Sequence, residues 1–195
     1  MSAAPEVLDS TAGLVALARA FDYPRADFWD EIEENVPDEW GLPSLPRRAQ
    51  PEREEDYARA FNIDGMLLYE GFHRGAEGRE GILEDVMRFY AFFDLKLSET
   101  QRDYPDHLVT ELEFLSYLAM REAEAIGDGS DATPYQRAQR DFIVRHLDLW
   151  LPSFARRLNL LQEPASMYGP LASSLLRLVR SRSDRLNRQL EGAFS

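Results

Sequence analysis

Apolar residues recur every three or four positions along most of the chain, and this period constrains the fold more than any other feature. In the stretch 106–126, for example, Leu108, Leu112 and Leu115 fall on one face of a helix. No stretch of any length alternates apolar and polar residues as a half-buried strand would, and no internal repeat appears. The pattern predicts an all-α fold of about eight helices, forming a single domain over residues 1–195.

Proline and glycine mark where these helices end. The expected helices cover 8–21, 26–36, 52–62, 81–95, 106–126 and 133–149, a helix over 151–161 with Pro152 in its first turn, and a last helix after Gly169-Pro170 to about Leu190. Asp9, Ser10 or Thr11 is expected to cap the first of them. Loops are expected over 37–51, 63–80 and 127–132, and residues 1–7 and 190–195 are expected to be loose.

The charge balance argues against two classes of partner. Thirty-five acidic residues against 22 basic ones give a net charge of −13, so nucleic acid and anionic lipid should repel the chain. Basic residues gather only near the end, where we interpret five arginines as a solvated helix face. These are Arg177, Arg180, Arg182, Arg185 and Arg188.

The absence of cysteine excludes disulfides, thiolate catalysis and cysteine-held zinc or iron–sulfur clusters. No run approaches the roughly 18 apolar residues of a spanning helix. The first residues also lack the basic region and apolar core of an export signal. We therefore expect a cytoplasmic protein that does not insert stably into a membrane.

The stretch YPDHLVTELEF at 104–114 collects a histidine and several carboxylates. Asp106 can cap a helix that starts there, with Pro105 just outside it. His107 and Glu111 then lie one turn apart on one face. Proton transfer by such a pair is conceivable, but no nucleophile or cofactor is evident. From the residues alone, a cap plus a surface pair is the better interpretation, and acid–base catalysis ranks second.

A second stretch, MLLYEGFH at 66–73, raises two further alternatives. Glu70 and His73 have the E-x-x-H spacing of di-iron bundles, but those sites need the motif twice and no second copy exists. Glycines around this copy also make a helix doubtful, so a chance match is the better interpretation. Apolar residues on a loop need a core or a partner. We expect Leu67 and Leu68 to enter the core and Tyr69 to form a groove wall for an apolar peptide.

Several motifs in a fixed order resemble the TorD/NarJ family of redox-enzyme maturation chaperones, which includes DmsD-like proteins. The order is Y57-x3-F61, Y69-E70, FYAFFDL at 89–95, YPDHLVTELEFLSYLA at 104–119, FIVRHLDLWLPSF at 142–154 and MYGPLASSLLRLV at 167–179. The resemblance spans about Leu14 to Val179. The pair PDH-L-x-x-E-L-E-F and H-L-x-x-W-x-P-x-F is fairly specific, whereas either motif alone is weak.

This resemblance implies a helical cytoplasmic chaperone without a cofactor. Its partner would be the apo catalytic subunit of a molybdopterin oxidoreductase of the dimethyl sulfoxide reductase family, bound through that subunit's N-terminal twin-arginine signal region before export. It also implies a peptide groove lined by Pro105, Asp106 and His107, with Tyr69 as its aromatic wall. Glu70 flanks Tyr69, and Glu111 and Glu113 match the motif but frame the groove.

Other features of the family pattern have different consequences. The residues before Tyr69, NIDGMLL, depart from the family's usual Gly/Pro-rich approach, so the rim of the groove is expected to differ. His146, Leu147, Trp150 and Phe154 match the family but are spaced for core packing. A helical enzyme with an Asp/His/Glu acid–base or metal site is the alternative, and a helical regulatory protein a weaker one. The client's identity and the choice between monomer and homodimer stay open.

Overall fold

The computed structural model describes residues 4–25, 28–29, 42–43, 47–61, 68–75, 78–97, 104–162 and 167–192. Its helices are α1 (Ala4–Phe21), α3 (Gln50–Phe61), α4 (Glu70–His73), α5 (Arg79–Phe92), α6 (Leu108–Gly127), α7 (Thr133–Phe142), the π-helical turn η2 (Ile143–Leu147), α8 (Asp148–Leu158) and α9 (Tyr168–Gly192). Among these residues the only β pairing is an isolated bridge between Tyr69 and His107. The predicted all-α class is confirmed. The helix expected over 26–36 lies almost entirely outside the described residues.

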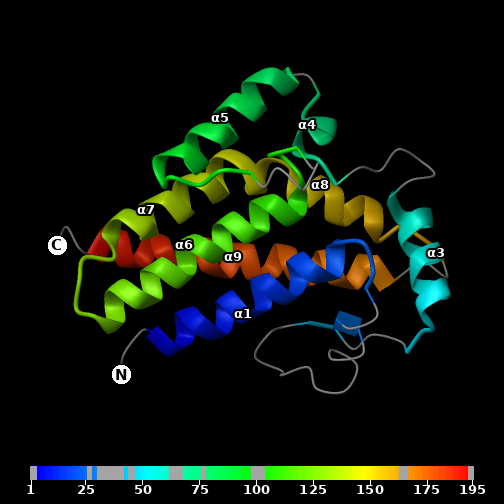
Figure 1. The fold of residues 1–195 in the computed structure, drawn as a ribbon, viewed down its shortest axis with the longest axis horizontal. Helices are drawn as coiled ribbons and strands as arrows, with labels where there is room; N and C mark the ends of the chain where they lie inside the picture. The colour runs from blue at the N-terminus through cyan, green and yellow to red at the C-terminus, as the bar shows by residue number, and fades with distance from the viewer. Residues whose placement is uncertain are drawn as a thin grey trace.

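The long helices run side by side along the longest axis of the molecule (Figure 1). Helix α6 packs against α1 and α7, and α9 packs against α7, α8 and α1. Helix α5 lies at the edge of this bundle, and the short α4 contacts both α5 and α8 (Figure 1). The two segments that the sequence singled out, around Tyr69 and around His107, therefore meet where α5 joins the bundle.

The predicted inner faces enter one shared core. Leu108, Leu112 and Leu115 on α6 are fully buried, as the helical period requires. On α5 the buried residues are Ile82, Val86 and Tyr90. One apolar cluster contains all six of these side chains, so the helices on either side of the site share a packed interior.

The first helix begins earlier than the sequence indicated. It starts at Ala4, four residues before the expected start at Leu8, and Val7 is fully buried against α6 residues. Ser10 and Thr11 are therefore not caps but lie inside the helix, where both hydroxyls donate to the Val7 carbonyl oxygen. The predicted bounds of two other segments were also wrong. Helix α9 continues to Gly192, and a short helix, α4, interrupts the loop expected over 63–80.

Pro152 does not begin a helix. It lies inside α8, which follows η2 and α7 without a break. An interior proline costs a helix roughly 3 kcal/mol. The surrounding residues Trp150, Leu151 and Phe154 are each at most 1% exposed, and burying a side chain of this size contributes roughly 1.5–3 kcal/mol. Packing therefore outweighs the local preference, and the wide π-helical turn lies directly before α8.

The basic end of the chain is not simply a solvated face. Arg182 is buried and donates to Gln139 Oε1 at 2.7 Å and to Ser10 Oγ at 2.6 Å. Burial lowers the pKa of Arg182 to about 10. The neighbouring Arg185 pairs with the buried Glu122 at 2.8 Å. These contacts tie α9 to α1, α6 and α7, so two of the five arginines have structural roles. No helix within the described ranges is long and apolar enough to cross a bilayer.

We expect Leu112→Ala to lower the free energy of unfolding by about 2–5 kcal/mol, because it opens a cavity at a fully buried position. Met120→Ala on the same helix is the control, since Met120 is 48% exposed and should change stability by only about 0.5 kcal/mol. Urea denaturation followed by circular dichroism measures both. Equal effects of the two substitutions would contradict the assigned inner face of α6.

Candidate functional site

A short antiparallel bridge joins the two segments that the sequence singled out. The Glu70 amide donates to the Asp106 carbonyl oxygen at 2.9 Å, and the Leu108 amide donates to the Leu68 carbonyl oxygen at 2.7 Å. Tyr69 and His107 lie opposite each other in this bridge, and their rings meet edge to face at 4.9 Å. All six predicted site residues belong to this region: Tyr69, Glu70, Pro105, Asp106, His107 and Glu111.

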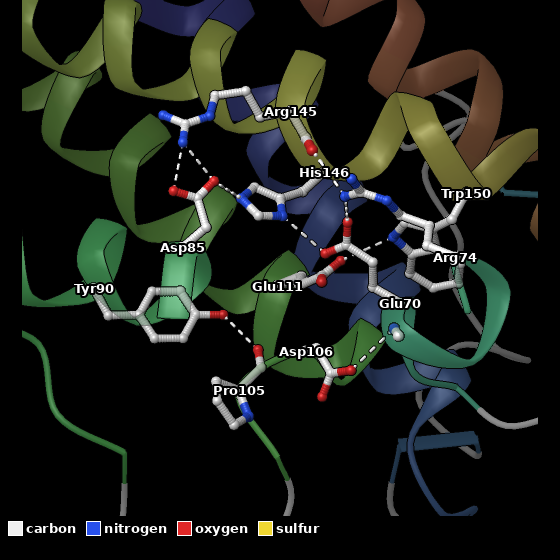
Figure 2. Close-up of polar contacts among 11 residues, drawn as sticks. Glu70, Arg74, Asp85, Tyr90, Pro105, Asp106, Glu111, Arg145, His146 and Trp150 are labelled. Atoms are coloured by element: carbon white, nitrogen blue, oxygen red, sulfur yellow. Dashed lines mark hydrogen bonds and ion pairs between the residues drawn. The ribbon is translucent and has the colours of Figure 1, made fainter. Parts of the chain in front are cut away.

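Asp106 does not cap α6. Its side chain is fully buried, and Oδ2 accepts a hydrogen bond from the Gly71 amide at 3.0 Å (Figure 2). Oδ1 lies 3.6 Å from Arg79 Nη2. A Cβ on residue 71 would approach Asp106 Oδ2 to 3.0 Å and the Arg79 side chain to 2.8 Å, so this close approach requires glycine. Asp106 thus holds the start of α4 instead of the start of its own helix.

His107 is the residue that caps α6. Its Nδ1 accepts from the Val109 amide at 3.3 Å, and the ring is only 7% exposed. The expected surface pair between His107 and Glu111 is wrong, because Glu111 is fully buried and receives the Trp150 indole N–H at 3.3 Å. Glu113, in contrast, is exposed.

Aromatic rings form the open side of the bridge. Tyr69 is half-buried and lies edge to face with Tyr104, which is 53% exposed. The Arg79 guanidinium lies over both rings, 4.4 Å from the centre of Tyr104 and 5.5 Å from that of Tyr69. Pro105 is held in place by a hydrogen bond, because its carbonyl oxygen accepts from the Tyr90 hydroxyl at 2.9 Å. This face is the part of the bridge that a partner can reach.

An ionic network whose centre, at Glu70 and His146, is buried lies beneath the bridge (Figure 2). Glu70 Oε2 is 2.8 Å from His146 Nδ1, and Glu70 Oε1 pairs with Arg74. His146 Nε2 lies 3.2 Å from Asp85 Oδ2, and Asp85 also pairs with Arg145. Burial by itself would raise the pKa of Glu70, but the hydrogen bonds from His146 and Arg74 outweigh it and hold that pKa below its ordinary value.

Glu70 and Glu111 form a buried carboxyl pair. Burial, followed by the charge of Glu70, raises the pKa of Glu111 well above its ordinary value. Two adjacent carboxylates in a low dielectric do not both ionise readily, and the two opposite shifts assign the charge to Glu70 and the proton to Glu111. The protonated Glu111 can then donate to Glu70 while it accepts from Trp150.

The chemistry of this network favours a structural role over catalysis. A cavity of about 600 Å³ between α5 and η2 is lined by Arg74, Asp85, Arg145 and His146, whereas Glu70 and Glu111 are completely enclosed. His73 does not join Glu70 in a metal site, because its ring stacks on Trp150 at 5.1 Å. No group of three or more His, Asp or Glu residues within the described ranges is placed to hold a metal ion.

Sequence reasoning missed several residues of this region. His146 was assigned to core packing, and it is indeed buried, but it is also the central partner of Glu70. Asp85, Arg79 and Tyr104 drew no assignment. Tyr104 begins the YPDH stretch and could have been recognised there. The contacts of Asp85 and Arg79 come from distant segments that no local spacing reveals.

Comparison with known proteins gives consistent matches. Residues 18–156 match the model of the nitrate reductase delta subunit family. The chain is 46% identical over 177 residues to the chlorate reductase assembly chaperone protein of Ideonella dechloratans, covering 88% of each chain. It is also 46% identical over 182 residues to the selenate reductase assembly chaperone protein of Thauera selenatis, covering 91% of this chain and 90% of that one. A dimethyl sulfide dehydrogenase assembly chaperone protein of Rhodovulum sulfidophilum is 42% identical over 69% of this chain and 58% of its own.

We expect two isosteric substitutions in the carboxyl pair to have opposite results. Glu70→Gln removes the charge that partners His146 and Arg74, and it should lower the free energy of unfolding at pH 7 by about 3–5 kcal/mol. Glu111→Gln replaces a group that is already neutral, so the variant should be at least as stable as the wild type. Chemical denaturation of both variants measures this, and a greater loss in Glu111→Gln would contradict the assignment.

The same pair predicts a pH dependence. The unfolded chain releases the Glu111 proton near pH 4.3, whereas the folded chain retains it to a higher pH. The folded state therefore binds more protons above about pH 4.3, and this group makes stability fall as pH rises towards the raised pKa. Glu111→Gln should remove that fall, which denaturation across pH 4.5–8 would detect.

Proposed function

Because the chain belongs to the TorD/NarJ family of redox-enzyme maturation chaperones, matching its nitrate reductase delta subunit model over residues 18–156, we propose that it is a system-specific assembly chaperone for a molybdenum enzyme. Its client is the apo catalytic subunit of a molybdopterin oxidoreductase of the dimethyl sulfoxide reductase family. It holds that subunit competent for cofactor insertion and assembly.

The observation that carries this proposal is the near full-length similarity to two assembly chaperones. Both are 46% identical to the chain over about nine-tenths of its length, and their names assign them to chlorate and selenate reductase. A third relative is named for dimethyl sulfide dehydrogenase. These relatives are assembly chaperones and not catalysts, so the helical-enzyme alternative is not favoured. The enclosed carboxyl pair, which no substrate can reach in this conformation, supports the same choice.

We further propose that binding occurs in the cytoplasm and engages the client's N-terminal signal region before export. A chain with a net charge of −13 attracts a cationic signal at long range. Guanidinium groups of such a signal suit aromatic faces and carboxylates, both of which are present at the bridge. A complex with one client subunit can form whether the chaperone is a monomer or a homodimer.

Of the six predicted residues, some would contact the client and the others would hold the contact face in place. Tyr69 and its neighbour Tyr104 would contact the client, since they form the accessible face. Glu70 and Glu111 would support that face from the buried network, and Pro105 and His107 would hold the second strand of the bridge. Asp106 is buried, but its Oδ1 lies 3.6 Å from the Arg79 guanidinium that covers both rings, so it could pair with a client guanidinium that takes this position.

Co-expression with the apo catalytic subunit from the same organism should give a complex that survives affinity purification. Deleting the chaperone gene should leave that subunit inactive and depleted of molybdenum, because no protein would hold it open for cofactor insertion. Enzyme activity and metal analysis measure this. Normal activity and molybdenum content in the deletion strain would refute the proposed function.

Tyr69→Ala should weaken client binding by at least about 2 kcal/mol, because it removes the central ring of the proposed contact face. Phe92→Ala is the matched control, since Phe92 is 78% exposed on α5 and lies outside the bridge. Binding of apo-subunit to each variant can be measured by calorimetry, alongside a thermal melt. Unchanged affinity in Tyr69→Ala would remove the bridge from the binding site.

A further inference from the structure

Asp106 has an unmet capacity for hydrogen bonding. It is fully buried, yet Oδ1 has no hydrogen-bond partner among the described residues. Its ionic neighbour, Arg79 Nη2, is 3.6 Å away, which is too far for a hydrogen bond. A buried carboxylate oxygen is normally satisfied, and charge-assisted bonds to guanidinium are about 2.7–2.9 Å long. The site can therefore bind a guanidinium more closely than Arg79 does.

The surroundings of Asp106 have the composition of a guanidinium cage. Tyr104 and Tyr69 present their rings to the Arg79 guanidinium at 4.4 Å and 5.5 Å, and the Asp106 carboxylate lies at its edge. Planar guanidinium stacks on aromatic rings and pairs with carboxylate through two parallel bonds, whereas the lysine ammonium does neither as well. The cage is thus suited to arginine in particular.

Arg79 is loosely held in this cage. Its side chain is 45% exposed, and its ion pair with Asp106 is long, at 3.6 Å. It is the first residue of α5, where the helix dipole disfavours a positive charge. The residue before it, Gly78, has a φ of 79° and provides no side-chain cap. Local helix preferences therefore do not explain an arginine at this position.

We propose that Arg79 is an internal stand-in for an arginine of the client, occupying the cage formed by Tyr69, Tyr104 and Asp106 until a client arginine displaces it. This inference rests on the proposed function for the identity of the ligand, and it adds the chemistry and regulation of that site. An incoming guanidinium gains the short contact with Asp106 that Arg79 lacks. Displacing Arg79 costs little, because half-exposed ion pairs and cation–π contacts are weak.

Competition of this kind has a useful consequence for recognition. While Arg79 occupies the cage, a cation that makes only one weak contact gains little by displacing it. The cage therefore favours ligands that make the full bidentate contact with Asp106. Removing Arg79 should therefore raise affinity for arginine peptides, even though it removes a residue from the site. A residue that contributed only packing would give the opposite result.

The test uses calorimetric titration of the full chain with the blocked peptide acetyl-Ala-Arg-Arg-Ala-amide and its lysine counterpart. We expect Arg79→Ala to bind the arginine peptide about fivefold more tightly than the wild type, which corresponds to removing about 1 kcal/mol of competing contact. The lysine peptide should gain no such advantage. Arg79→Gln, which retains most of the aliphatic stem over Gly71, is measured in parallel so that the result does not depend on packing of that stem.

Two controls separate cage occupancy from net charge and from folding. Arg88→Ala removes the same charge from α5 at a side chain that is 77% exposed and faces Glu84, and it should leave peptide affinity unchanged. The double variant Arg79→Ala/Tyr104→Leu should lose the gain, since one wall of the cage is missing. Thermal melts of each variant verify that the fold is retained.

The outcomes distinguish this inference from the proposed function. A gain seen with arginine but not lysine peptide supports the stand-in, whether or not a client subunit co-purifies. Unchanged or weaker arginine-peptide binding in both Arg79 variants overturns it, even if the client complex forms normally. An equal gain for lysine peptide, or the same gain in Arg88→Ala, also overturns it, because long-range charge would then account for the effect.

Discussion

The ionised carboxylate of Glu70 is the group on which the site depends. It lies in a four-residue helix that could not persist in isolation, since helices far longer than this are marginal in water. Arg74 on one oxygen and His146 on the other fix it against η2, and the neutral Glu111 adjoins it from α6. Groups from the end of α4, from η2 and from α6 therefore meet at one charge. Their contacts set the position of the bridge between Tyr69 and His107.

Regular features of the fold were predictable because they depend on short-range patterns. The apolar period on α6 correctly identified Leu108, Leu112 and Leu115 as buried, and Gly and Pro correctly marked the break after Gly127. The ordered motifs also placed both halves of the site in one family pattern. These patterns extend over only a few helical turns, so they can be recognised in a single sequence.

The contacts that define the site could not be predicted in the same way. Glu70 and His146 are separated by 76 positions, and no spacing rule connects them. Helix-capping preferences also predicted the wrong cap for α6. Asp106 is an excellent cap by residue type, but its side chain instead accepts a hydrogen bond from the Gly71 amide across the bridge. Pro152 was misplaced for a related reason, since burial of Trp150 and Phe154 outweighs its preference for a helix start. In each case a long-range contact overrode a weaker local preference.

The distribution of charge across the site suits a protein that must bind a partner and later release it. The charge that holds the scaffold, on Glu70, is fully buried and has Arg74 and His146 as its partners, so removing these partners would leave an unpaired charge in a low dielectric. The rim is built differently, because Arg79 is half-exposed and its ion pair is long. Weak, solvent-screened contacts of this kind can be exchanged without disturbing the network below. Rigid support beneath an exchangeable rim therefore lets affinity be set at the surface while the fold stays constant.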